Sequence, residues 1–183
     1  MSLERPRAVG NVVGSLKRFE DGTATLELQN GEKYRCKLGG WKAKRYCTSE
    51  EIQMYSVYPK RRNSEILFKV VSSIKNTEGR EDGRFFINGK VEKIKESRVV
   101  LSVWSTKHQK NYWIDVQGKL DCKAGEYWKI EAKLSGQELK IEQAERLSEV
   151  FNLEEVMEGG GEPAITVVEE VVQGAGSERA GAI

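Results

Sequence analysis

The sequence predicts an all-β protein that contains two tandem copies of one small domain. Three observations support this fold class. Apolar and polar residues alternate in RVVLSVW, NYWIDV and YWKIEAKL, which is the period expected of half-buried strands. Gly, Asn and Asp residues that favour turns separate such segments. A pattern in the first half of the chain also recurs in the second half.

The repeat consists of three blocks that occur in the same order in both halves. The first aligns VVGSLKRFEDGTATLEL, from Val12, with INGKVEKIKESRVVLSV, from Ile87, at an offset of 75 residues. The second aligns Tyr34-x-Cys36-x-Leu38 with Tyr112-x-Ile114-x-Val116 at an offset of 78. The third aligns YSVYPKRRNSEILF, from Tyr55, with WKIEAKLSGQELKI, from Trp128, at an offset of 73. We therefore predict domains at about 11–75 and 84–147, a linker at 76–83 and a tail at 148–183.

In the first copy, the turn residues fix how neighbouring strands pair. A three-residue loop with Gly31 in the left-handed conformation would place Leu26 opposite Tyr34 and keep the apolar residues on one face. Further along, Thr48-x-x-Glu51 resembles a helix capping box. A short helix or turn is therefore expected between the third and fourth strands, although Ile52 to Tyr58 also fits a strand.

In the second copy, the segment WSTKHQKNYW joins two strands whose apolar sets must share one face. A hairpin centred on His108 and Gln109 would pair Val103 with Ile114 and place Trp104 directly opposite Trp113 on the outer face. Such a pair could stack a ligand, contact the other domain or an oligomer partner, or simply stabilise the hairpin. We interpret His108 as a polar loop residue rather than a catalytic base, and the parity of Trp128 predicts a core position.

Five strands in about 65 residues, with a long connection between the third and fourth, are typical of the OB-fold, a small Greek-key barrel. The second copy resembles the bacterial single-stranded-DNA-binding protein family in FFINGKVEKI, RVVLSVWSTKHQKNYWIDVQGKL and AGEYWKIEAKL, whereas the first copy resembles it weakly. Two departures are the short LDCKAG connection and a tail that ends SERAGAI. The resemblance implies two tandem five-stranded OB-fold barrels that bind single-stranded nucleic acid, DNA in preference to RNA.

Composition excludes several classes of site. The sequence contains no phosphate-binding glycine loop, no serine–histidine pair and no Cys/His zinc pattern, so we predict a protein that is not an enzyme and binds no metal or cofactor. Three widely spaced cysteines, Cys36, Cys47 and Cys122, suggest reduced structural thiols in a cytoplasmic protein. No apolar run approaches the eighteen or so residues of a membrane span, and no signal peptide is recognisable.

Cations interleaved with aromatic residues are the main indication of a binding surface, because cations neutralise phosphates and aromatic rings stack on bases. They occur around the two tryptophans, on the outer face of the third strand of the first copy, and in WKAKRY and YPKRR. The candidate residues are Trp104, Trp113, Lys107, Lys110, Lys33, Arg35, Lys37, Trp41, Lys44, Arg45, Tyr58, Lys60, Arg61 and Arg62. Any single lysine among them is more often just a solvated residue. The alternative is a protein-interaction or assembly module that uses the barrel surface or the tail, and the sequence is compatible with a homo-oligomer.

The tail carries charge opposite to that of the rest of the chain. Residues 148–183 hold eight acidic residues and one basic residue, a net charge of −7, and we expect most of this Gly-rich segment to be disordered. Residues 1–147 hold 29 Lys and Arg against 20 Asp and Glu, a net charge of +9. The tethered tail should therefore compete with a polyanion for the same surface.

Removal of residues 148–183 is expected to tighten the binding of single-stranded oligonucleotides, and the gain should be largest at low salt, where charge repulsion is screened least. Fluorescence anisotropy over a salt series compares the full chain with the truncated chain. Equal or weaker binding after truncation would contradict competition by the tail.

Overall fold

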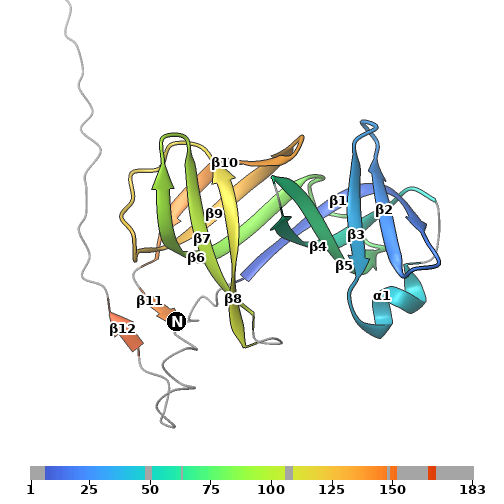
Figure 1. Cartoon of the computed structure of the whole chain (residues 1–183), viewed down its shortest axis with the longest axis horizontal. Coiled ribbons are helices and arrows are strands. Elements are labelled where there is room, and N and C mark those ends of the chain that lie inside the picture. The colour runs from blue at the N-terminus through green and yellow to red at the C-terminus, as the bar shows by residue number, and fades with distance from the viewer. Residues whose placement is uncertain are drawn as a thin grey trace, which may run out of the picture.

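The protein, described here by a computed structural model, consists almost entirely of β-strands (Figure 1). The structure describes residues 7–47, 51–62, 64–105, 109–147, 149–151 and 165–167. Within these ranges it confirms the predicted all-β class, with closed five-stranded pairing and one short helix. No helix in the described part of the chain has the length and hydrophobicity needed to cross a membrane.

The first five strands close into a ring, which we call ring 1. Its elements are β1 (Arg7–Arg18), β2 (Thr23–Leu28), β3 (Lys33–Leu38), α1 (Gly40–Tyr46), β4 (Gln53–Arg62) and β5 (Glu65–Ile74). The strands pair in the circular order β1–β2–β3–β5–β4–β1. All of these pairs are antiparallel except β3 with β5, which are parallel.

The next five strands close in the same circular order and form ring 2. They are β6 (Arg84–Lys95), β7 (Arg98–Ser105), β8 (Lys110–Gln117), β9 (Tyr127–Ser135) and β10 (Glu138–Arg146). Ring 2 has no helix between β8 and β9. In the predicted tail, β11 (Glu149–Phe151) pairs with β12 (Ile165–Val167). The expected disorder of the remaining tail residues falls outside the described residues.

Each ring encloses a hydrophobic core formed by the inward-facing residues of its strands. The fully buried side chains include Leu16, Leu26, Tyr34 and Phe68 in ring 1, and Ile87, Leu101, Ile130 and Leu139 in ring 2. Burial of one such large apolar side chain contributes about 1.5–3 kcal/mol. Strict alternation of buried and more exposed positions along β1 and β2 shows why period two in the sequence predicted strands.

The two rings match at the positions that the sequence alignment makes equivalent. Leu16 pairs with Leu26 in ring 1, and Val91 pairs with Leu101 in ring 2, both at the offset of 75 residues. Gly14 and Gly89 are equivalent in the same way. A Cβ atom at Gly14 would lie 2.2 Å from the carbonyl oxygen of Glu27, and one at Gly89 would lie 2.8 Å from that of Ser102. Glycine at both positions lets the first strand of each ring pass close to the second.

An antiparallel contact between β1 and β6 joins the rings. Gly10 and Phe85 are Cα partners in this contact, and these two residues are also equivalent at the offset of 75. The pairing therefore relates the rings by a local two-fold arrangement. Because Gly10 has no side chain, the buried ring of Phe85 lies over it and stacks on Phe68, with centroids 5.9 Å apart.

Each ring also extends its last hairpin to the other ring. From ring 2, the β9–β10 hairpin covers one end of ring 1, where the hydroxyl of Tyr34 donates to the carbonyl of Gly136 at 2.5 Å. The backbone N–H of Ile66 donates to Oε1 of Gln137 at 2.7 Å. From ring 1, the β4–β5 hairpin approaches β8, where Nε of Arg61 lies 3.8 Å from a carboxylate oxygen of Asp115.

The predicted hairpin between β2 and β3 is confirmed. Leu26 pairs with Tyr34, the N–H of Leu28 donates to the carbonyl of Glu32, and Gly31 has a φ of 83°. The predicted short helix between β3 and β4 is confirmed as α1, and β4 starts at Gln53, so the alternative of a strand at Ile52 to Tyr58 also holds. Because α1 ends at Tyr46, Thr48-x-x-Glu51 does not mark its start, and residues 48–50 lie outside the described residues. No side chain caps the start of α1 at Gly39.

The predicted pairing of the two tryptophans was also wrong. Val103 pairs with Tyr112 rather than with Ile114, so Trp104 faces Asn111 and Trp113 faces Ser102. A shift of two residues leaves every side chain on the same face, which is why the apolar pattern could not distinguish the two registers. Trp104 and Trp113 still share the outer face, as diagonal neighbours. Trp128 is half-buried and packs against the core, close to the prediction.

Gly10→Ala is expected to destabilise the protein by about 1–3 kcal/mol, because it adds volume to a filled core. The new Cβ would lie 2.3 Å from Cδ1 of the buried Phe85 ring. Chemical denaturation measures the free energy of unfolding. Ser72→Ala, at an exposed position of β5, serves as the control and should stay within about 0.5 kcal/mol of the wild type. If both variants had the same free energy of unfolding, the ring of Phe85 would be able to move away from the added Cβ atom without cost, which would contradict the prediction.

Candidate functional site

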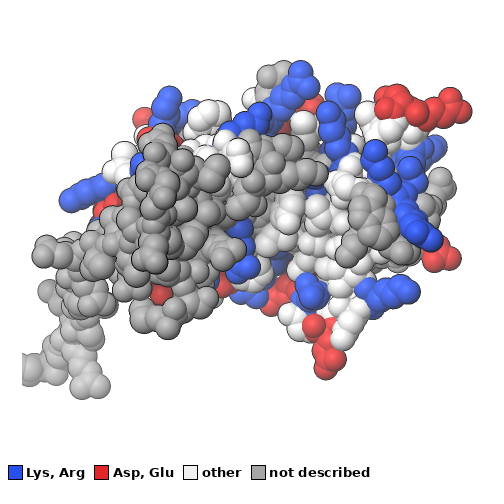
Figure 2. Space-filling view, turned by 90° about the horizontal axis from the view of Figure 1, so that it is seen from below, with Lys and Arg blue, Asp and Glu red and all other residues white. Residues whose placement is uncertain are grey.

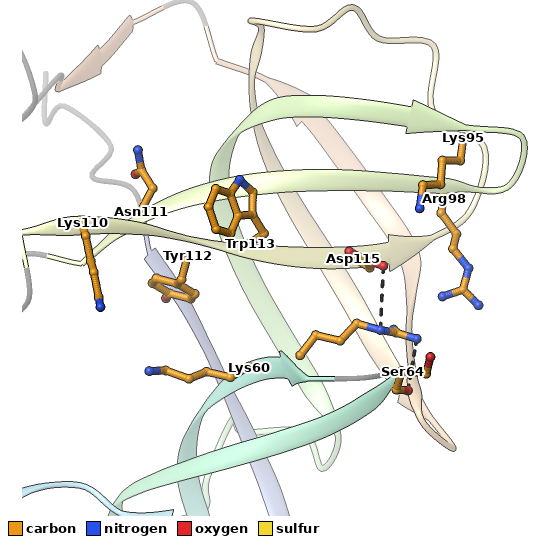
Figure 3. A pocket seen from close by; sticks show the side chains of 10 residues that line it. Lys60, Ser64, Lys95, Arg98, Lys110, Asn111, Tyr112, Trp113 and Asp115 are labelled. Carbon is orange, nitrogen blue, oxygen red and sulfur yellow. Dashed lines mark hydrogen bonds and ion pairs between the residues drawn. The ribbon is translucent and has the colours of Figure 1, made fainter.

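A groove lies between the two rings, where the β4–β5 hairpin approaches β8. Its volume is about 1160 Å³. The β6–β7 hairpin contributes its wall at one end, so residues from both rings face the same space (Figure 3). The lining residues are Lys60, Arg61, Ser64, Lys95, Arg98, Lys110, Asn111, Tyr112, Trp113 and Asp115.

Aromatic side chains line the groove along β8. Trp113 is 60% exposed, an unusual state for so large an apolar side chain. Tyr112 is half-buried, and Nζ of Lys60 lies 5.9 Å from the centre of its ring. Burial, together with the neighbouring Tyr58, raises the pKa of Tyr112 to about 12, so its phenol stays protonated at neutral pH. Tyr58 itself is 38% exposed on β4.

Among the described residues that line it, the groove carries five cationic side chains and one carboxylate. Two of the cations have acidic partners: Arg98 pairs with Glu138, and Arg61 pairs with Asp115. The other three, Lys60, Lys95 and Lys110, form no ion pair within the described part of the chain. The groove therefore has an excess of positive charge next to an accessible indole ring.

A second basic surface, the outer face of β3, lies on ring 1. Lys33, Arg35 and Lys37 are all exposed there, as predicted, and pair across β2 with Glu27, Thr25 and Thr23. Lys33 forms an ion pair with Glu27 at 3.2 Å. No aromatic residue of β2 or β3 shares this face within the described residues, because Tyr34 points into the core.

The structure brings together only some of the predicted site residues. Lys60, Arg61, Lys110 and Trp113 line the groove. Trp104 is half-buried and does not line it, and Arg62 is exposed at the end of β4. Lys44 and Arg45 are exposed on α1. The side chain of Trp41 and the whole of Lys107 fall outside what the structure describes.

Sequence reasoning missed several residues that line the groove. Lys95, Arg98, Asn111, Tyr112 and Asp115 were not among the candidates, yet all face the same space. The repeat contained one usable indication: Tyr112 aligns with Tyr34, and each tyrosine lies where the hairpin of the opposite ring arrives. Lys95 and Arg98 flank a tight turn and had no feature that separated them from solvated residues.

Charged side chains are distributed over both rings (Figure 2). In that view Lys and Arg side chains are spread over the visible surface, and Asp and Glu side chains gather mainly at its edges, as at the upper right and at the bottom.

The described residues contain no group of three or more His, Cys, Asp and Glu side chains placed to hold a metal ion. The three cysteines are unpaired, with Cys36 and Cys47 buried and Cys122 half-buried, and burial raises the pKa of each thiol.

Comparison with known proteins identifies a shared fold. No family model matches the sequence, and no curated protein sequence is significantly similar to it. Among solved structures, the crystal structure of the wild-type single-stranded DNA binding protein from Thermus aquaticus is similar, with a TM-score of 0.50 and 12% sequence identity. The match covers 79% of this chain and 94% of that chain. At this identity the likeness establishes the fold, which agrees with the predicted OB-fold relationship.

Trp113→Phe should remove a large part of the tryptophan fluorescence that acrylamide quenches, because the indole of Trp113 is 60% exposed. Trp128→Phe is the matched control, since that indole is half-buried and donates from Nε1 to Glu126 at 3.1 Å. Stern–Volmer plots of the free protein compare the variants. An equal loss of quenching in both would contradict the exposed position of Trp113.

Proposed function

We propose that the protein binds single-stranded nucleic acid, with DNA favoured over RNA, in the groove between the two rings. The observation that carries this proposal is the exposed indole of Trp113 beside Lys60, Lys95 and Lys110, which have no acidic partner among the residues that the structure describes. An exposed aromatic ring within a basic groove matches both parts of a single strand. The ring stacks on a base, and the cations neutralise the adjacent phosphates.

Stacking and phosphate contacts would both contribute to the affinity of the groove for a single strand. Stacking of one base on an aromatic side chain contributes about 1–3 kcal/mol, and it accepts any base because every base has an aromatic face. Each phosphate contact releases counterions, so the affinity should fall as salt increases. Lys60 and Lys110 come from different rings, and both rings are therefore needed to complete the site.

Our choice of DNA over RNA follows the likeness in fold to a solved structure that is a single-stranded DNA binding protein. In our proposal the two rings are copies of one domain. The equivalent pairs Leu16–Leu26 and Val91–Leu101 support this duplication. The outer face of β3, with Lys33, Arg35 and Lys37, would contact only the phosphate backbone of a longer strand, because no ring is exposed beside these cations on β2 or β3.

One observation favours an additional role in protein assembly. Ile52 is 63% exposed at the edge of a second hollow, which Met54, Ile74 and Val13 also line. An apolar side chain at such a site could contact a protein partner. Salt dependence separates the two functions: binding of a strand should weaken steeply with salt, whereas apolar contact with a protein should not.

Trp113→Ala and Lys60→Ala should weaken binding in different ways. Loss of the indole should cost about 1–3 kcal/mol at every salt concentration if it stacks one base. Loss of Lys60 should lower the slope of log K against log salt by about one, the value for one phosphate contact. Anisotropy titrations with poly-dT and poly-U over a salt series measure both effects.

Lys75→Ala is the matched charge control, because Lys75 lines the second hollow rather than the groove. It should leave the salt slope nearly unchanged. Wild-type affinity of the Trp113 variant for every single strand would exclude the groove as the binding site. Equal binding of duplex and single strand would argue against stacking.

A further inference from the structure

Asp115 is the one carboxylate that lines the groove within the part of the chain that the structure describes. It lies on β8 two residues after Trp113, and because side chains alternate along a strand, both project from the same face. Two residues along a strand correspond to roughly 7 Å, about the reach from the centre of a stacked base to a group at its edge. A base stacked on Trp113 would therefore bring its edge toward Asp115.

Arg61 lies beside this carboxylate and comes from the other ring. Its Nε is 3.8 Å from Oδ2 of Asp115, and its Nη2 donates to the carbonyl of Ser64 at 3.2 Å (Figure 3). The side chains of Arg61 and Asp115 remain 18% and 24% accessible. A separation of 3.8 Å is too long for a hydrogen bond, so the carboxylate retains lone pairs for another donor. The two side chains thus present hydrogen-bond donors next to two acceptors.

We propose that Arg61 and Asp115 together select guanine in the groove. The Watson–Crick edge of guanine presents the O6 acceptor followed by the N1–H and N2–H donors. The guanidinium can donate to O6, while the two carboxylate oxygens accept from N1–H and N2–H. The order of donor, acceptor and acceptor reproduces the edge that cytosine offers to guanine in a base pair. This inference rests on the proposed single-strand function and adds base selection to it.

The other bases match this pair of side chains poorly. Adenine and cytosine each place a ring nitrogen acceptor beside the amino group, and this acceptor would face the carboxylate. Thymine and uracil present one N–H between two carbonyl oxygens, which leaves a carboxylate oxygen against an acceptor. Buried polar groups without partners are costly, so each mismatch should reduce affinity. Stacking alone would make none of these distinctions.

The experiment compares oligonucleotides of ten nucleotides that differ at one central position. Oligo-dT is the reference, and the central thymine is replaced by guanine, hypoxanthine, adenine or cytosine. Anisotropy at fixed salt gives each affinity. A good bidentate contact discriminates by about 1–3 kcal/mol, and we expect guanine to bind about tenfold more tightly than the reference. Hypoxanthine keeps O6 and N1–H but lacks the N2 amino group, and it should fall between guanine and thymine.

Asp115→Asn tests the role of the carboxylate. An amide offers only one acceptor oxygen, so this variant should bind the guanine oligonucleotide no more tightly than oligo-dT. Loss of a negative charge from the groove should at the same time raise its affinity for oligo-dT. Asp121→Asn is the matched control, because Asp121 is exposed in the connection between β8 and β9 and does not line the groove. It should retain the preference. Thermal unfolding of both variants verifies that they fold.

The outcomes distinguish this inference from the proposed function. Equal affinity for all five oligonucleotides, with clear binding, would overturn guanine selection and leave single-strand binding intact. A preference for guanine that survives in Asp115→Asn would also overturn it. If no single strand binds at any salt concentration, both the function and the inference are wrong.

Discussion

The antiparallel pairing of β1 with β6 is the contact on which the arrangement of the molecule depends. It places Gly10 against Phe85 and fixes the rings in a local two-fold relation. From that relation follows the reciprocal placement of the hairpins, with the β9–β10 hairpin on ring 1 and the β4–β5 hairpin near β8. The groove is therefore a product of how the rings join, and neither ring contains it alone. β1 pairs with β2 only from Gly14 onward, and β6 pairs with β7 only from Lys90 onward. The contact between residues 7–11 and 84–88 therefore occupies backbone groups that would otherwise form an open edge.

Glycine makes this architecture possible at two levels. Gly14 and Gly89 let the first strand of each ring pass close to the carbonyl groups of its neighbour. Gly10 does the same between the rings, where any side chain would overlap the ring of Phe85. Close backbone approach is the physical requirement shared by all three positions. Phe85 then extends the aromatic packing of ring 1, through Phe68 to Tyr34, toward ring 2.

The sequence was sufficient for features that local chemistry determines. The pairing of Leu26 with Tyr34 was predicted because turn length and apolar faces specify the same register. The pairing of Trp104 was wrong because two registers that differ by two residues bury the same side chains. The helix was correctly expected between the third and fourth strands, but Thr48-x-x-Glu51 does not mark its start, because the chain turns into α1 earlier, at Gly39 and Gly40. At Gly40 the φ of 78° favours glycine.

The groove could not be predicted from the alternation of apolar and polar residues, because it is formed by residues of both rings. Lys60 and Trp113 were each identified as candidates, but nothing in either segment shows that the two residues face one space. Their proximity comes from the β1–β6 contact and the long β4–β5 hairpin, both of which are tertiary features. Asp115 could not be identified as a candidate from the sequence, because an isolated acidic residue on a strand is common. Its side chain becomes part of a possible site only because Arg61 of the other ring lies next to it.

The two places where a hairpin of one ring meets the other ring differ in packing, although the local symmetry makes them equivalent. At one, Tyr34 is 1% exposed and its hydroxyl binds Gly136, so the space is filled. At the other, Tyr112 remains half-buried and the groove stays open. In a symmetric dimer of one-domain chains, every substitution would appear at both junctions at once. A single chain carrying both rings is free of that constraint, so one junction can be filled while the other stays open.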